Sequence, residues 1–172
     1  VTVSTGNEFS TSIDNSGRIT GNTAIYVQDT SGTYSTQINN NSSGVMVGQN
    51  YAVNRAGSPG QSVNIFNEGQ IAGSIVATNL TNAGGGVVTL KTNADKDDLR
   101  NSGSAGSAQL SGTFSLESGA TLRVAIVSTS DEGSYSYLQA ANVNLNGTLD
   151  VDVKANSGLS LSSGLNSFGI IH

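Results

Sequence analysis

The amino-acid sequence predicts an all-β fold, a right-handed parallel β-helix (solenoid) with single-stranded coils of about 25 residues. Apolar and polar residues alternate with a period of two along many short segments, which is the pattern of strands with one buried face. One phrase, two such segments around a glycine, recurs along the chain. Gly17, Gly44 and Gly69 are spaced at about 25 residues, an interval that indicates stacked repeats.

The clearest copy of this phrase occupies residues 143–154. Its apolar positions are Val143 and Leu145 before Gly147, and Leu149, Val151 and Val153 after it. Polar residues fill the alternate positions, so both segments are expected to be strands with one face in the core and one in water. Looser copies occupy residues 114–124, 65–73 and 13–21. In a parallel β-helix each coil supplies two or three such strands, which pair with the next coil about 4.8 Å away.

The other elements follow in chain order. Further apolar runs predict strands in a first region, residues 1–109, at positions 24–27, 34–38, 45–53, 74–77 and 87–90. Residues 54–61 contain Pro59 and are expected to form a loop that leaves the stack. Residues 91–106 are dense in charge and break the pattern, which predicts an inserted loop.

Residues 110–172 are expected to continue the same stack as a C-terminal segment. Its folding and stacking core is predicted at Leu116, Leu122, Val124, Val143, Leu145, Gly147, Leu149, Val151, Val153, Phe168 and Ile170. Asparagines lie close to the turn glycines throughout the chain, at Asn15, Asn41, Asn67, Asn101 and Asn146. Because stacked asparagine side chains can hydrogen-bond from coil to coil, a polar ladder is expected at these turns.

Two other folds fit part of the sequence. A sandwich or jelly roll also uses short strands, and Asn146-Gly147 has the residues of a hairpin turn. Disorder fits a chain with 22 glycines and only 35% hydrophobic residues. Strand periodicity and low net charge oppose disorder, and no apolar 3.6-residue period extends far enough to predict a helix.

Composition excludes several classes of partner and scaffold. The formal net charge is −5, from 7 basic and 12 acidic residues, and the basic residues form no run. Nucleic acid and anionic membranes are therefore not expected as partners. The sequence has no cysteine, which excludes a disulfide scaffold. It starts at Val1 rather than methionine and ends in a strand-like Phe168-Gly-Ile-Ile, so it is expected to be a fragment of a longer protein.

Residues 110–171 resemble the C-terminal end of autotransporter passenger domains, a family of Gram-negative type V secretion proteins. The motifs that carry the resemblance are Gly119-Ala-Thr-Leu-Arg-Val124, Tyr137-Leu-Gln-Ala140, Val143-Asn-Leu-Asn-Gly-Thr-Leu-Asp-Val-Asp-Val153 and Phe168-Gly-Ile-Ile171. Asn15-Ser-Gly-Arg-Ile-Thr-Gly21 and Asn67-Glu-Gly-Gln-Ile-Ala-Gly73 resemble the passenger repeats of adhesive and self-associating members. The charged segment 91–106 departs from the family's pattern.

This resemblance implies a location, a role and partners. It implies export through the outer membrane to the bacterial cell surface, with residues 110–172 acting as the autochaperone region on which upstream coils stack. It implies adhesion or self-association, with a surface receptor or a second copy of the passenger as partner. The outer-membrane barrel of the family is not part of this sequence.

Catalysis and cofactors are not expected. The only histidine is His172, so a Ser-His-Asp triad has no central residue, and zinc or iron sites lack their ligands. Asp95, Asp97 and Asp98 are a weak Ca²⁺ candidate, although their spacing matches no EF-hand loop. With Lys96 and Arg100 they also leave open a second interpretation, a glycan-binding or polysaccharide-degrading β-helix of the tailspike or lyase type.

The tyrosines Tyr26, Tyr34, Tyr51, Tyr135 and Tyr137 could stack on sugars, although the chain has no tryptophan to build a strong platform. Asp150 and Asp152 alternate with buried positions and are expected to solvate the surface. The sequence therefore favours a non-enzymatic surface protein.

Overall fold

The computed structural model describes residues 1–5, 10–29, 35–56, 60–95, 97, 99, 103–127, 135–153 and 170–172. These residues form strands and no helix. In chain order the strands are β1 (Thr2–Thr5), β2 (Thr11–Asn15), β3 (Arg18–Asp29), β4 (Ser35–Asn40), β5 (Val45–Ala56), β6 (Ser62–Asn67), β7 (Gln70–Ala77), β8 (Asn79–Asn82), β9 (Val87–Thr92), β10 (Ser104–Ala105), β11 (Ser107–Leu110), β12 (Thr113–Leu116), β13 (Thr121–Ile126), β14 (Tyr137–Gln139), β15 (Asn142–Leu145) and β16 (Thr148–Val153).

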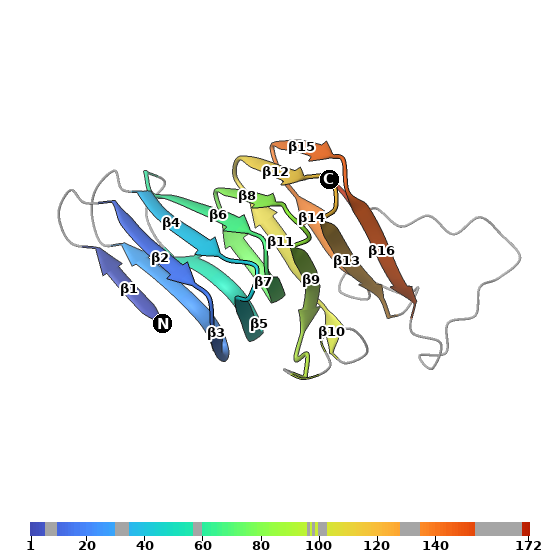
Figure 1. Cartoon of the computed structure of the whole chain (residues 1–172), viewed down its shortest axis with the longest axis horizontal. Coiled ribbons are helices and arrows are strands. Elements are labelled where there is room, and N and C mark those ends of the chain that lie inside the picture. The colour runs from blue at the N-terminus through green and yellow to red at the C-terminus, as the bar shows by residue number, and fades with distance from the viewer. Residues whose placement is uncertain are drawn as a thin grey trace, which may run out of the picture.

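The strands form two sheets that run along the molecule (Figure 1). The larger sheet has the order β1-β3-β5-β7-β9-β13-β16, with β10, β11 and β14 attached beside this path. The smaller sheet has the order β15-β12-β8-β6-β4-β2. Every pairing between named strands is parallel except that of β9 with β10. The prediction of an all-β chain with parallel pairing is therefore confirmed.

The sandwich alternative depended on a hairpin at Asn146-Gly147, and that hairpin does not form. The strand before the turn, β15, pairs with β12 in the smaller sheet, whereas the strand after it, β16, pairs with β13 in the larger sheet. A Cβ on Gly147 would lie 2.5 Å from the carbonyl oxygen of Ala120 and 2.6 Å from that of Glu117. Glycine is required here because the turn packs directly on the backbone of the preceding one.

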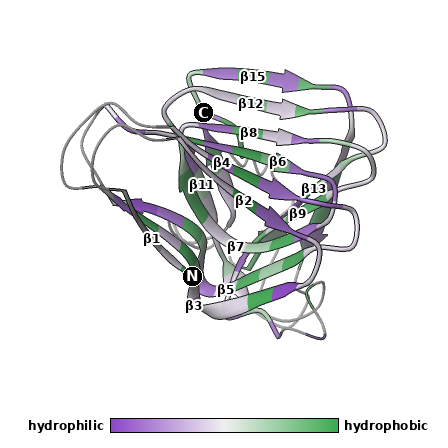
Figure 2. Ribbon diagram, turned by 60° about the vertical axis from the view of Figure 1, so that its left-hand side comes forward, coloured by the Kyte–Doolittle hydropathy of each residue, from purple (hydrophilic) through white to green (hydrophobic). Residues whose placement is uncertain are grey.

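The larger sheet bends sharply along a row of glycines. In β5 the register shifts between Val47 and Tyr51, and a Cβ on Gly48 would lie only 1.7 Å from the Tyr51 carbonyl oxygen. Its neighbour in the next strand, Gly73, has a φ of +131°, which side chains rarely tolerate. Beyond this bend β7 leaves β9 and pairs instead with β11. We call the strands beyond the bend the side arm: β1, β11, β14 and the C-terminal halves of β3, β5 and β7. Figure 2 shows β1 and β11 apart from β9 and β13.

The core lies between the sheets and is built from rows of aliphatic residues in register. One row joins Ile38, Ile65, Leu80 and Phe114. A second joins Met46, Ile71, Val88 and Leu122, and a third, in the side arm, joins Ile25, Val53, Ile75, Ala108 and Leu138. All of these side chains are at most 2% exposed. Burying each large aliphatic side chain contributes about 1.5–3 kcal/mol, so the rows are the main source of cohesion.

The predicted C-terminal core is divided between buried and exposed positions. Leu116, Leu122 and Val124 are buried, and Val143 and Ile170 are partly buried against the core. In contrast, Leu145, Leu149, Val151 and Val153 are 41–52% exposed. Their register partners in β12 and β13 face inward, but no described strand pairs with the outer edge of β15 or β16. The expectation that these four residues are buried is therefore wrong for the described part of the chain, and Phe168 lies outside it.

The number of residues between partners on neighbouring strands of one sheet varies along the chain. Asparagines that occupy one row are separated by 25, 27 and then 15 residues. Farther on, the side chain of Asn79 bonds to a backbone group 34 residues later, and Arg123 bonds to a carboxylate 27 residues later. Much of the extra length between β9 and β11 falls in segment 91–106, which includes β10.

Candidate functional site

The charged segment expected near residue 95 does not form a metal site among the described residues. Asp95 and Asp97 are exposed, and the Asp97 N–H donates to the Asp95 Oδ1 at 2.8 Å. Asp97 also lies 3.9 Å from the Arg18 guanidinium. No group of three or more His, Cys, Asp or Glu side chains meets in the described part of the chain, and Asp98 lies outside it. Among the described residues the weak Ca²⁺ candidate therefore consists of two carboxylates, those of Asp95 and Asp97.

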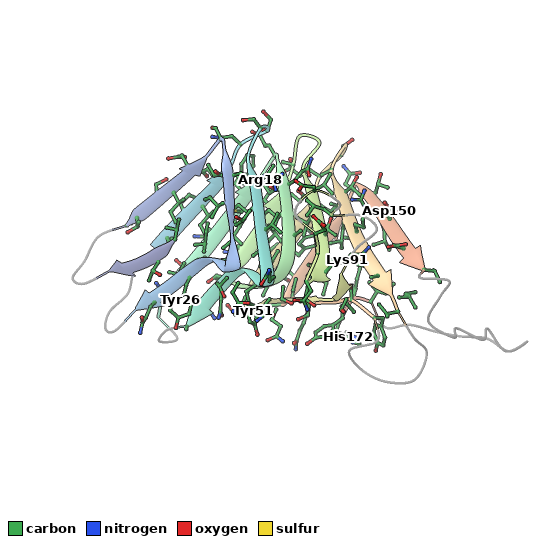
Figure 3. The ribbon with its side chains drawn as sticks, turned by 90° about the horizontal axis from the view of Figure 1, so that it is seen from below. Arg18, Tyr26, Tyr51, Lys91, Asp150 and His172 are labelled. Carbon is green, nitrogen blue, oxygen red and sulfur yellow. The ribbon has the colours of Figure 1, made fainter. Side chains whose placement is uncertain are left out.

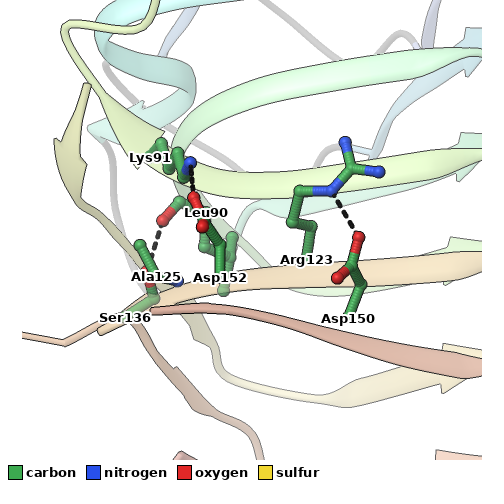
Figure 4. A network of polar contacts seen from close by, with 7 residues as sticks. All are labelled: Leu90, Lys91, Arg123, Ala125, Ser136, Asp150 and Asp152. Atoms are coloured by element: carbon green, nitrogen blue, oxygen red, sulfur yellow. Dashed lines mark hydrogen bonds and ion pairs between the residues drawn. The ribbon is translucent and has the colours of Figure 1, made fainter. Parts of the chain in front are cut away.

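Two ion pairs join three neighbouring strands of the larger sheet (Figure 4). Lys91 Nζ donates to Asp152 Oδ2 at 2.5 Å, and Arg123 Nε donates to Asp150 Oδ2 at 2.9 Å. Leu90, Val124 and Val151 are register partners, and Lys91, Ala125 and Asp152 each follow them by one residue. Lys91 therefore reaches across the strand that carries the small Ala125.

The burial of the two ion pairs differs. The Lys91 side chain is 0% exposed and that of Asp152 is 27% exposed, whereas both partners of the other pair have partial exposure. Beside them the buried Ser136 Oγ donates to the Leu90 carbonyl at 2.5 Å and accepts from the Ala125 N–H at 3.0 Å. The expectation that the two aspartates merely solvate the surface is therefore wrong. A fully buried lysine is out of reach of a ligand, so the network is a structural clamp.

A ladder of buried asparagines runs across β2, β4, β6 and β8 of the smaller sheet. Asn15 Nδ2 donates to Asn40 at 2.7 Å, Asn40 Nδ2 to Asn67 at 2.7 Å, and Asn67 Nδ2 to Asn82 at 2.6 Å. All four side chains are at most 6% exposed. On the next strand of the sheet, β12, the register partner of Asn82 is Leu116. The ladder of asparagines therefore ends at Asn82.

The asparagine ladder was predicted, but several of its members are different. Asn41 lies outside the ladder and donates to the Ser16 hydroxyl at 2.9 Å, while Asn40 takes the buried place. Asn146 is exposed, and Asn101 lies outside the described residues. Asn82 was missed because its turn glycine lies four residues later, at Gly86, whose carbonyl accepts from Asn82 Nδ2 at 3.1 Å.

The outer surface of the smaller sheet is the first candidate for binding. We call it the polar face, formed by Ser12, Asp14, Gln37, Asn39, Asn64, Phe66, Asn79, Thr81, Thr113, Ser115, Asn142 and Asn144. Figure 2 shows hydrophilic and hydrophobic residues alternating along several of these strands. One member of the polar face is charged, Asp14, and one is apolar, Phe66, which is 37% exposed.

The side chains of the polar face are held in rows by hydrogen bonds. Asn39 Nδ2 donates to Asp14 Oδ1 at 2.7 Å, and Gln37 Nε2 donates to Asn39 Oδ1 at 3.0 Å. Asn79 Nδ2 donates to Asn64 Oδ1 at 2.7 Å. These bonds fix the amide side chains, so the polar face is a preorganised surface.

The outer surface of the side arm is the second candidate. A hollow of about 330 Å³ is lined by Tyr135, Tyr137, Gln139 and His172. An adjoining hollow of about 430 Å³ shares Gln139 and His172 and is also lined by Arg55, Val76 and Gln109. Figure 3 places His172 on the same long side of the molecule as Tyr26 and Tyr51, away from Arg18. Of the tyrosines expected to face sugars, Tyr135 and Tyr137 meet in one hollow, and Tyr34 lies outside the described residues.

None of the described residues forms a helix long and apolar enough to cross a membrane. The chain was compared with protein-family models, curated proteins and solved structures, and no match was found in any of the three.

Proposed function

We propose that the chain is a right-handed parallel β-helix that serves as a non-enzymatic passenger segment of a Gram-negative autotransporter, exported to the cell surface, where it mediates adhesion by self-association. The polar face carries this proposal. The β-helix is supported by the strands from β1 to β9, which alternate between two parallel sheets, with inward residues repeated in register. The passenger part is supported by the sequence motifs between Gly119 and Ile171.

The polar face suits contact between two copies of the chain. It spans all six strands of the smaller sheet and is almost free of charge, so two copies approach without strong repulsion despite the net charge of −5. Amides and hydroxyls each donate and accept hydrogen bonds, so the same surface can complement itself. Many weak bonds repeated along two stacks then add up, as in other multivalent contacts.

Phe66 gives the polar face an anchor. It projects from β6, in the interior of the sheet, in register with Asn39 and Thr81 on either side. Interface hot spots are commonly aromatic side chains surrounded by polar residues, because the surrounding residues exclude water from the aromatic group at the centre. We therefore place the centre of the self-associating contact at Phe66.

The proposed autochaperone role is supported by the clamp between β9, β13 and β16. It ties Asp152 to a lysine 61 residues earlier in the chain. The clamp therefore gives residues 110–172 a specific contact to the neighbouring upstream strand β9, of the kind that would hold an upstream coil stacked on this segment. This role concerns residues 110–172 and is independent of the polar face.

The proposal is tested by adding like charge to the polar face. The triple variant Asn64→Asp/Thr81→Asp/Ser115→Asp places three carboxylates on β6, β8 and β12 of each copy. We expect self-association, measured by sedimentation equilibrium of the purified chain, to weaken by about tenfold or more because the facing carboxylates repel each other. Clumping of cells that display the chain should fall in parallel.

A matched control carries the same added charge elsewhere. Gln70→Asp/Thr121→Asp/Thr148→Asp alters one outward row on β7, β13 and β16 of the larger sheet. This control should associate like the unaltered chain. Equal weakening in both triple variants would show a net-charge effect, and unchanged association in the first would overturn the assignment of the polar face.

A further inference from the structure

We infer that the two adjoining hollows on the side arm form a binding site for an acidic glycan, with one sugar of a disaccharide unit in each hollow. This site lies on a different surface from the polar face and does not depend on self-association. It is supported by four features: a concave shape, aromatic side chains, planar amides and a fixed guanidinium.

The first hollow has the composition of a site for a sugar ring. Tyr135 and Tyr137 supply aromatic surface, and Gln139 and His172 supply polar groups, around about 330 Å³. The apolar C–H face of a pyranose packs on an aromatic ring, while its hydroxyls need donors and acceptors at the rim. Small-molecule sites commonly combine apolar or aromatic walls with a few convergent polar groups in this way.

The side chains of this hollow are held in place by their neighbours. Gln109 Nε2 donates to the Tyr137 hydroxyl at 3.1 Å. The rings of Tyr137 and His172 meet edge to face, with centroids 6.4 Å apart and an interplanar angle of 77°. The backbone of His172 is itself paired with β14, since its N–H donates to the Leu138 carbonyl at 2.9 Å and its carbonyl accepts from the Ala140 N–H at 3.2 Å. The hollow is therefore formed by consecutive rungs of the side arm.

The second hollow adds a cation. Arg55 lines it together with Gln109, Gln139 and His172. Arg55 Nη1 donates to the Gln61 carbonyl at 2.9 Å and to the Thr78 hydroxyl at 3.0 Å, which fixes the guanidinium plane. These two bonds engage one nitrogen of the group, so Nε and Nη2 retain donors for a carboxylate.

The two hollows share Gln139 and His172, so they form one continuous site. A planar amide can donate to one hydroxyl and accept from another, which suits the junction between two sugars. A carboxylate at Arg55 gives a charge-assisted hydrogen bond, stronger than a neutral one. These features together favour a uronic-acid-containing glycan over an uncharged one.

The experiment compares two oligosaccharides that differ in charge. Isothermal titration calorimetry of the full chain is carried out with a hyaluronan tetrasaccharide, which alternates glucuronic acid with N-acetylglucosamine, and with chitotetraose, which contains only N-acetylglucosamine. We expect hyaluronan tetrasaccharide to bind about tenfold or more tightly than chitotetraose. The side-chain amide signals of Gln109 and Gln139 should shift in ¹H–¹⁵N spectra during the same titration.

Single substitutions test which side chains contribute to glycan binding. Tyr137→Leu and Gln139→Ala remove the aromatic surface and the shared amide, and each should weaken binding of hyaluronan tetrasaccharide by about tenfold. Arg55→Lys keeps the charge but loses the planar fork, and should reduce the preference for the acidic sugar. The matched control is Tyr26→Leu, on the same arm but outside both hollows, which should bind normally.

Thermal unfolding of each variant shows whether the variant is folded. Because Gln139 is exposed, the Gln139→Ala substitution leaves the core intact. Absence of binding by the unaltered chain, equal affinity for the two oligosaccharides, or unchanged binding by Gln139→Ala would each overturn the inference.

Discussion

Asn40→Leu is expected to lower the free energy of unfolding by about 3–5 kcal/mol, the largest effect that we predict for any single substitution in this chain. Asn40 is 0% exposed and occupies the middle of the asparagine ladder. It accepts from Asn15 at 2.7 Å and donates to Asn67 at 2.7 Å and to the Gly44 carbonyl at 3.2 Å. Leucine would leave Asn15 Nδ2 without its acceptor and Asn67 Oδ1 without its donor, and each such buried group costs about 1–3 kcal/mol.

The adjacent residue provides the control for this prediction. Asn41→Leu removes one exposed hydrogen bond, from Asn41 Nδ2 to the Ser16 hydroxyl, and should cost no more than about 1 kcal/mol. Urea denaturation of both variants measures the difference. If the two substitutions were equally harmful, the buried ladder would not be a source of stability and the assignment of Asn40 to it would be wrong.

Asp152→Asn is expected to destabilise the chain by about 2–4 kcal/mol, the second largest effect. The substitution removes the carboxylate that Lys91 Nζ contacts at 2.5 Å while the lysine stays fully buried. A buried lysine that loses this carboxylate loses a large part of the interaction that offsets its desolvation cost. Urea denaturation, in which the midpoint shifts with an unchanged slope, is the measurement.

Two comparisons make this prediction specific. Asp150→Asn breaks the more exposed pair with Arg123, for which about 1 kcal/mol or less is expected. Lys91→Met should cost less than Asp152→Asn, because Asp152 is partly exposed and water can hydrate the carboxylate that remains. A larger effect for Lys91→Met than for Asp152→Asn would argue against desolvation of the lysine as the cause.

The strands and their inward faces could be predicted from the sequence because they depend on a local signal, the period of two. This signal identified Leu122 and Val124 as buried. The parallel pairing of their strands was predicted from a second signal, the phrase around a glycine that recurs along the chain. It failed for Leu149 and Val151, which have the same pattern but lie on the last strand of the sheet. Burial of a strand residue depends on a neighbouring strand that covers it, as well as on the alternation of apolar and polar residues.

The features that sequence reasoning missed depend on contacts between distant residues. Residues 39–41 are three consecutive asparagines, and although alternation with Ile38 places the middle one on the inward face, only its contacts with Asn15 and Asn67 show that it belongs to the ladder. The pairing of Asp152 joins residues 61 positions apart. The hollow on the side arm is lined by residues far apart in the chain, such as Arg55 and His172. The arm itself lies beyond the sharp bend at Gly48. Glycine frequency alone did not predict that bend.

The central claim, that successive coils stack in parallel and in register, is tested most directly by cysteine cross-linking, since the chain has no cysteine of its own. Gln37 and Asn64 are register partners on β4 and β6, and paired strands lie about 4.8 Å apart, a separation that a disulfide spans. Gln37→Cys/Asn64→Cys should therefore oxidise to an intramolecular disulfide. Gln37→Cys/Phe66→Cys, displaced by two residues along the same strand, should not. A disulfide in the displaced pair and none in the register pair would contradict the parallel stack.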